Sequence, residues 1–154
     1  MSNDVLDAEE RAALREVARG CLCRQARQAA RTLTRFYDRH FVASGIEPTQ
    51  FNLLVALRLS QPVSLVTLAG HLGLERTTLT RNLAILERDG LVQTKSGIDA
   101  RQRLLSLTPA GRRTLQQNLA AWKKAQQAAI AALGKSDFNR LLSALSLTNK
   151  LTTN

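Results

Sequence analysis

The sequence has few of the residues that build cross-linked or metal-holding proteins. It contains two cysteines, two histidines, three prolines and 4% aromatic residues in 154 positions. Cys21 and Cys23 have no second pair with which to form a disulfide framework or a zinc site, and His40 and His71 lie far apart. We therefore expect no metal, no other cofactor, and a reduced protein with two thiols.

Catalytic motifs and membrane-spanning segments are also missing. The chain has no glycine-rich phosphate loop, nucleophile elbow or paired-carboxylate motif, which argues against an enzyme. No apolar run approaches the length of a membrane span, and the amino terminus, MSNDVLDAEE, is acidic and polar. We expect a soluble cytoplasmic protein that is not an enzyme and has no membrane partner.

Positive charge is what the sequence has in excess. Lysine and arginine total 22 against 12 acidic residues, which gives a formal net charge of +10. Such a surplus suits a polyanionic partner, because contacts to phosphates release counterions and supply affinity that does not depend on sequence. Basicity alone is a weak signal, since soluble proteins also carry it without binding nucleic acid.

Hydrophobic periodicity, helix caps and turn residues predict the order of elements. Pro48 suits the first turn of a helix, Ser64 suits a helix cap, and Gly20 is a candidate break or bend in the first helix. The expected elements are a long helix over 8–41, short helices after Ile46, from Ser64 to Gly73 and from Glu75 to Gly90, strands over 91–95 and 103–107, a helix that Thr108 and Pro109 open and that extends to Leu133, and a last helix that Ser136 caps.

This order corresponds to a winged helix-turn-helix plan, in which a basic three-helix unit carries a β-hairpin. The first helix could reach about 50 Å, which is too long for one small lobe to bury. We therefore expect a single domain over 1–154, mainly α with a small β-hairpin wing, that forms a homodimer. Dimerisation helices at about 8–43 and 109–151 flank a winged helix-turn-helix lobe at about 47–107.

The residues between Ser64 and Arg88 fit a helix-turn-helix closely. Ala69, Gly73 and Leu79 supply the small residue, the turn glycine and the inner apolar residue that this motif needs. At 100° per residue, Leu83 and Leu86 share the inner side with Leu79, whereas Thr77, Arg81, Ala84 and Arg88 lie opposite. Hydroxyl and guanidinium groups on that outer face are typical of a recognition helix. The alternative is an ordinary polar helix start, and Arg88, beside two acids, is not expected to contact DNA.

The stretches LERTTLTRNLAILERDGLV and DARQRLLSLTPAGRR resemble the MarR family of bacterial regulators, and EPTQFNLLVAL extends the resemblance. It implies a regulator that binds double-stranded DNA at a pseudo-palindromic operator. Asp99 and Arg101 match the wing signature, in which the arginine enters the minor groove and the aspartate holds wing and recognition helix together. Glu75 departs from the aspartate that many members have there. The implied groove contacts are Arg76, Thr77, Thr78, Thr80 and Arg81, and Ser64 becomes a phosphate contact at a helix amino terminus.

The resemblance also implies a repressor that a small phenolic or aromatic acid releases from DNA. The effector would bind a cleft between the dimerisation helices and the DNA-binding lobe. Arg27, His40 and Phe51 are the candidate effector-binding residues. For the arginines of the first helix, a solvated face is the competing interpretation.

Three other functions stay open from the sequence. One is a thiol-based redox-responsive regulator, although Cys21 and Cys23 on one helix would point about 200° apart and could not pair without unwinding it. Small apolar filling is the favoured interpretation of these two residues. The others are a sequence-blind architectural DNA-binding protein, which would share the charge without needing a Thr/Arg face, and an enzyme.

Overall fold

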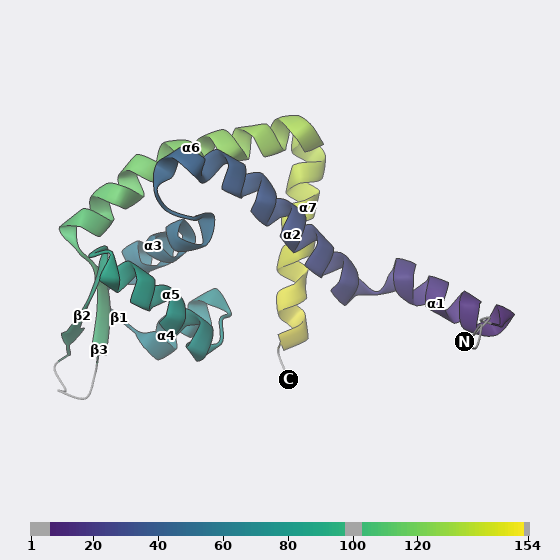
Figure 1. The fold of residues 1–154 in the computed structure, drawn as a ribbon, viewed down its shortest axis with the longest axis horizontal. Coiled ribbons are helices and arrows are strands. Elements are labelled where there is room, and N and C mark those ends of the chain that lie inside the picture. The colour runs from purple at the N-terminus through teal and green to yellow at the C-terminus, as the bar shows by residue number, and fades with distance from the viewer. Residues whose placement is uncertain (1–6, 98–102, 153–154) are drawn as a thin grey trace, which may run out of the picture. The chain divides into compact units, whose positions relative to one another are not determined.

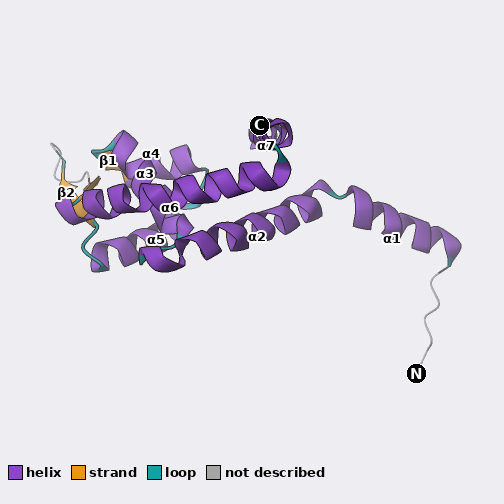
Figure 2. Cartoon of the chain, turned by 90° about the horizontal axis from the view of Figure 1, so that it is seen from above, coloured by secondary structure: helices purple, strands orange, loops and turns teal. Residues whose placement is uncertain are grey.

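The structure is a computed structural model that describes residues 7–97 and 103–152. The backbone contacts divide the chain into two units, Met1–Phe36 and Tyr37–Asn154, and the boundary falls inside the second helix. Figure 1 colours the chain from purple at the amino terminus to yellow at the carboxyl terminus. The described residues are mainly helical, and the sheet among them is small beside the helices (Figure 2).

The amino-terminal unit contains α1 (Ala8–Gly20) and most of α2 (Leu22–Phe41). The expected single helix over 8–41 is therefore wrong, because Cys21 has a non-helical ψ of 106° and separates the two. Gly20, the candidate break, is the last residue of α1. Side chains of α2 bond to the carbonyl oxygens at the end of α1, with Arg24 Nη1 2.7 Å from Ala18 O. The break thus combines a poor helix former with partners for carbonyl groups that a helix end leaves free.

The second unit holds the remaining elements. The end of α2 leads through a short 3₁₀ helix, η1 (Val42–Ser44), into α3 (Pro48–Ser60). Pro48 begins α3 as expected, and the Tyr37 hydroxyl donates to Gln126 Oε1 on the long helix α6. The other elements are β1 (Val63–Ser64), α4 (Leu65–Leu72), α5 (Arg76–Arg88), β2 (Val92–Ser96), β3 (Arg103–Leu107), α6 (Pro109–Leu133), α7 (Lys135–Leu147) and η2 (Thr148–Thr152).

Helices α4 and α5 form the expected helix-turn-helix. The Ser64 hydroxyl accepts from Thr67 N at 3.1 Å and caps α4, and Gly73 ends it with φ 60°, in the left-handed region that favours glycine. Ala69, the predicted small residue of the motif, is 5% exposed. The inner leucines of α5 lie in the core: Leu79, Leu83 and Leu86 are all buried.

The wing is a three-stranded antiparallel sheet in the order β1-β3-β2, rather than a hairpin alone. Strand β3 occupies the expected residues and β2 begins one residue later than expected, at Val92. The two strands pair from Val92 with Leu107 to Ser96 with Arg103. The short β1 was not expected, and it pairs Val63 with Leu105. Two residues are too few to show an alternating pattern in the sequence, so β1 depends on pairing with a distant strand.

Helix α6 begins as expected, with the Thr108 hydroxyl accepting from Gly111 N at 3.0 Å. It ends at Leu133, but the expected cap of the last helix is wrong. Helix α7 begins at Lys135, and Gly134, with φ 77°, takes the cap position in place of Ser136. Glycine adopts this φ without strain, so one residue ends α6 and starts α7. In the part of the chain that the structure describes, no helix has the length and apolar character to cross a membrane.

Candidate nucleic-acid interface

The outer face of α5 carries the residues that the sequence predicts for DNA contact. Arg76, Thr77, Thr78, Thr80 and Arg81 are all exposed, whereas Leu79 between them is 0% exposed. The buried leucines fix the helix against the core, and this orientation turns the hydroxyl and guanidinium groups toward solvent. The predicted division of α5 into an inner and an outer face is therefore confirmed.

The arginines of this helix differ in their partners. Arg88 Nε forms an ion pair with Asp89 at 3.1 Å, which braces the end of α5. Within residues 7–97 and 103–152, no ion pair holds Arg76 or Arg81. Two cations at the beginning and middle of the exposed face are thus available to an anion, as the charge-assisted binding of phosphates or guanine edges requires.

An open recess lies where the first turn of α4 faces α5. Leu65 of α4 and Arg76, Thr77, Thr80 and Arg81 of α5 line it. Leu65 is half-buried and was not among the sequence-predicted site residues. The sequence shows only that Leu65 directly follows the helix cap. Its place beside α5 depends on how the two helices pack, so the sequence does not indicate that it lines this recess.

The two helix starts in this lobe are capped differently. Ser64 is half-buried, and its Oγ lies 2.8 Å from Thr67 Oγ1 as well as capping α4. Glu75 precedes α5 with extended backbone but makes no side-chain cap bond. A glutamate is a weaker cap than the shorter aspartate, so the amide groups at the start of α5 lack that side-chain partner.

A side-chain hydrogen bond connects the wing to α5. The Thr94 hydroxyl of β2 donates to the Glu87 carboxylate of α5, which joins the two predicted reading elements. This pair was not among the sequence-predicted site residues. The predicted wing residues Asp99 and Arg101 lie outside the described residues.

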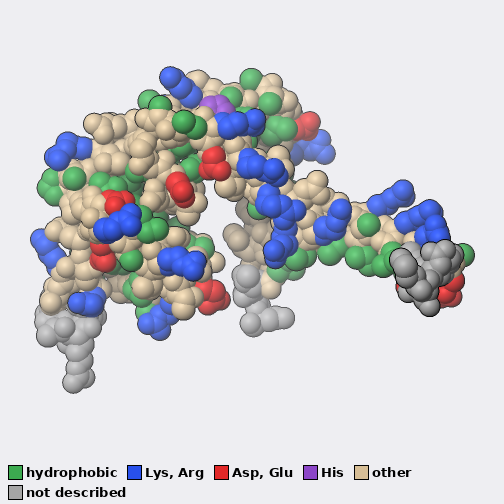
Figure 3. All heavy atoms as spheres, in the orientation of Figure 1, with side chains coloured by type: hydrophobic (Ala, Val, Ile, Leu, Met, Phe, Trp, Pro, Cys, Tyr) green, Lys and Arg blue, Asp and Glu red, His purple; other side chains and the backbone are tan. Residues whose placement is uncertain are grey.

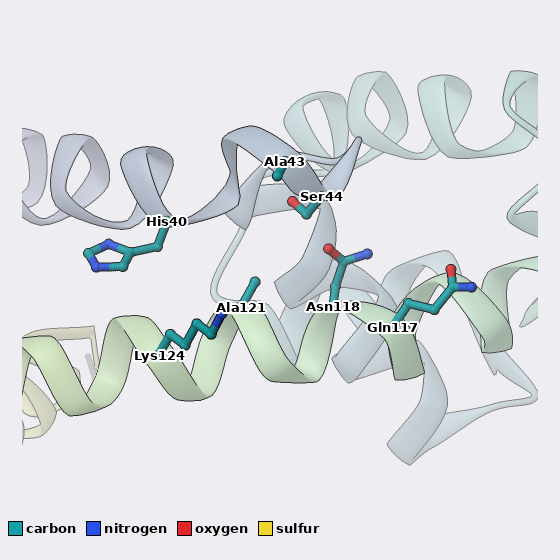
Figure 4. A pocket seen from close by; sticks show the side chains of 7 residues that line it. All are labelled: His40, Ala43, Ser44, Gln117, Asn118, Ala121 and Lys124. Atoms are coloured by element: carbon teal, nitrogen blue, oxygen red, sulfur yellow. The ribbon is translucent and has the colours of Figure 1, made fainter.

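A separate cavity of about 310 Å³ lies between α6 and the segment that joins α2 to α3. In Figure 4, His40, Ala43 and Ser44 form one wall, and Gln117, Asn118, Ala121 and Lys124 of α6 form the other. Asn118 is 3% exposed, and its Nδ2 donates to Thr114 O at 2.9 Å. The side-chain oxygen of Asn118 can therefore accept a hydrogen bond from a ligand in the cavity.

Of the three candidate effector residues, His40 lines the cavity. Phe51 is 3% exposed and packs in the core against Phe41, with ring centroids 5.3 Å apart. Arg27 is exposed in the amino-terminal unit, on α2, along which basic side chains gather (Figure 3). No group of three or more metal-ligating side chains is found among the residues that the structure describes.

Three comparisons with known proteins agree. The family model described as MarR family matches residues 46–99. The uncharacterized HTH-type transcriptional regulator YwoH of Bacillus subtilis is 31% identical over 87 residues, which are 56% of this chain. This chain spans 64% of the length of YwoH, which is less than two thirds. Among solved structures, the M. tuberculosis transcriptional regulator MosR in complex with DNA is 38% identical, with 87% of this chain and 99% of that chain covered and a TM-score of 0.74.

A probable transcriptional regulator from Pseudomonas aeruginosa is also similar, at 28% identity and a TM-score of 0.74 over 81% of this chain and 94% of that one. The matched family region contains α3, α4, α5 and β2, so it includes the exposed face of α5 and the recess beside it. The chain therefore belongs to the MarR family and has the winged helix-turn-helix fold of its transcriptional regulators.

Proposed function

We propose that this protein is a sequence-specific transcriptional regulator that binds double-stranded DNA as a homodimer, with α5 as its recognition helix. The observation that carries the proposal is the exposed face of α5. Arg76, Arg81 and three threonines are exposed there, while the leucines on the opposite face of the helix are buried. The similarity to MosR, which was solved in complex with DNA, supports it. A sequence-blind architectural protein would need the charge but not this set of base-reading side chains.

Each element has a distinct part in the proposed complex. Helix α5 enters the major groove, where the Arg81 guanidinium reaches a guanine edge or a phosphate. The amino end of α4, capped by Ser64, approaches the phosphate backbone with its free amide groups. The wing extends to the neighbouring minor groove, where Arg101 meets a negative potential without requiring a unique base.

Selection from a pool of random duplexes tests this proposal. The full-length protein is expected to enrich one pseudo-palindromic sequence, and Arg81→Ala is expected to enrich it less strongly and to lose the preference at one base pair of each half-site. Arg88→Ala is the matched control, because Arg88 lies on the same helix but pairs with Asp89. Failure of the wild-type protein to enrich any sequence would contradict the proposal.

We further propose that the protein is a repressor and that a small aromatic acid releases it from DNA by binding the α6 cavity. The volume of about 310 Å³ is in the range of small-molecule sites. Lys124 supplies a cation for a carboxylate, and the Asn118 carbonyl oxygen can accept from a phenol hydroxyl. The wall formed by η1 continues into α3, and the wall on α6 follows strand β3 of the wing. A ligand between the two walls can therefore change the position of the DNA-binding lobe.

Titrating the DNA complex with benzoate and its hydroxylated forms tests the cavity. We expect release of the wild-type protein, and release at higher ligand concentration for Lys124→Gln. Lys123→Gln is the matched control, because Lys123 is the exposed neighbour of Lys124 on α6 and does not line the cavity. Equal release of the two variants would contradict this placement of the effector.

Release by oxidation is a second candidate, favoured by the position of Cys21. Helix geometry does not separate the two thiols as expected, because Cys21 lies in the break between α1 and α2, and Cys23 is exposed. One peroxide and two thiols would give one disulfide and two waters. If oxidation is the signal, peroxide releases the wild-type protein but not the variant with both cysteines replaced by serine. If it is not, the two proteins keep the same DNA affinity in peroxide.

A further inference from the structure

Thr80 differs from an ordinary polar residue on the face of α5. Its hydroxyl donates to Arg76 O at 2.8 Å, one helical turn earlier. The only proton of that hydroxyl is therefore used within the helix, and it is not available to donate to a base. The remaining heavy atom of the side chain is the γ-methyl group, so Thr80 presents a methyl group and an acceptor oxygen to its surroundings.

The surroundings of Thr80 are partly apolar. Thr80 shares the open recess with Leu65, the half-buried first residue of α4. Thr77 and the two cationic side chains Arg76 and Arg81 complete the lining. A ligand of this recess therefore needs a small apolar group next to negative charge. The major groove of duplex DNA offers an apolar group next to negative charge, because the C5-methyl group of thymine projects into it and phosphates flank it.

We propose that Thr80 and Leu65 form a subsite for the C5-methyl group of one thymine in each half-site. This rests on the proposed function, since it requires α5 to enter the major groove. Thymine is the base with an apolar group on its major-groove edge, and threonine methyl groups suit this contact. Thr80 then selects an A·T pair by shape and burial of a methyl group rather than by a hydrogen bond.

The test removes single methyl groups from the DNA. Each thymine of the selected operator is replaced in turn by uracil, which keeps every hydrogen-bonding group of the base. The measured quantity is the ratio of the Kd for the uracil duplex to the Kd for the thymine duplex. For the wild-type protein we expect a ratio of about three to five at one thymine per half-site, the effect of burying one methyl group.

Variants at Thr80 separate the methyl group from the hydroxyl. Thr80→Ser keeps the hydroxyl and removes the methyl group, so the ratio at that thymine should fall to about one. Thr80→Val keeps a methyl group and removes the hydroxyl, so the ratio should persist even if the absolute affinity changes. Leu65→Ala should also lower the ratio, whereas Val66→Ala should not, because Val66 is 60% exposed and does not line the recess.

Two results would overturn the subsite. One is tight, specific binding by the wild-type protein with a ratio near one at every thymine. The other is a Thr80→Ser variant that keeps the full dependence on the methyl group. A protein that selects no operator at all would instead reject the proposed function, and the subsite with it.

Discussion

At Gly111 the first turn of α6 meets the backbone before β2 too closely for any side chain. A Cβ atom there would lie 2.9 Å from the Leu91 carbonyl carbon and closer still to its oxygen. Gly111→Ala must push α6 away from the wing, so we expect a loss of about 1–3 kcal/mol in the free energy of unfolding. Urea unfolding at fixed protein concentration measures it. Gly70→Ala is the control, because open space surrounds Gly70 and alanine favours the helix by about 0.5–1 kcal/mol. Equal stability of the two variants would contradict the packing argument.

Replacing Arg81 or Arg101, the two arginines predicted to contact DNA from the recognition helix and the wing, should change DNA binding in different ways. Arg81→Ala is expected to weaken operator binding by about 1–3 kcal/mol and to relax the preference at one base pair per half-site. Arg101→Ala should weaken binding to operator and random DNA more evenly, and flatten the salt dependence by about one phosphate per subunit. Salt titrations against operator, single-base variants and random duplex make the comparison. An Arg101→Ala variant that is silent at every salt concentration would leave the wing without a role in binding.

Residue roles that depend on near neighbours in the chain could be predicted from the sequence. Ser64 caps α4 and Thr108 caps α6 through bonds that span three residues, so their spacing is visible. The pair of Glu87 and Thr94 and the cavity residue Lys124 could not be predicted, because each depends on elements that only tertiary packing brings together.

At the scale of elements, α4 and α5 were predictable because their caps, turn glycine and inner leucines all indicate the same structure. The interruption at Cys21 was visible only as a candidate at Gly20, since the periodicity of apolar residues continues from α1 to α2. Strand β1 and the start of α7 were missed for opposite reasons. The first is set by pairing with β3, and the second by the φ of Gly134, which the nearby Ser136 obscured.

Helix α7 exposes apolar side chains in the part of the chain that the structure describes. Its Leu142 and Leu145 are 52% and 41% exposed, and none of its residues is buried. We attribute this surface to the proposed dimer, so replacing both leucines with aspartate should shift the sedimenting species from dimer to monomer at micromolar concentration. Leu59→Asp is the control, because Leu59 is 83% exposed on α3, in the DNA-binding lobe. A double variant that sediments as the wild-type protein would exclude α7 from the interface.

For the whole molecule, the proposed two-fold dimer fixes the spacing of its operator. Two copies of α5 related by a two-fold axis should contact half-sites whose centres lie about 10 base pairs apart, which is one turn of the duplex. Inserting five base pairs between the half-sites turns one of them to the opposite face of the duplex. A ten-pair insertion keeps both half-sites on one face but doubles their separation, so a rigid dimer cannot reach both. We expect either insertion to reduce affinity to that of a single half-site, and unchanged affinity after either one would contradict a rigid two-fold dimer.

We propose that this MarR-family chain recognises the base sequence of its DNA and does not bind by charge alone. With a net charge of +10, it should bind any duplex at low salt, so affinity by itself decides nothing. The direct measurement is the ratio of the Kd for a scrambled duplex of the same composition to the Kd for the selected operator, at physiological salt. We expect a ratio of at least about 10³ for the wild-type protein, and a clearly smaller ratio for Arg81→Ala. A wild-type ratio near one would contradict it.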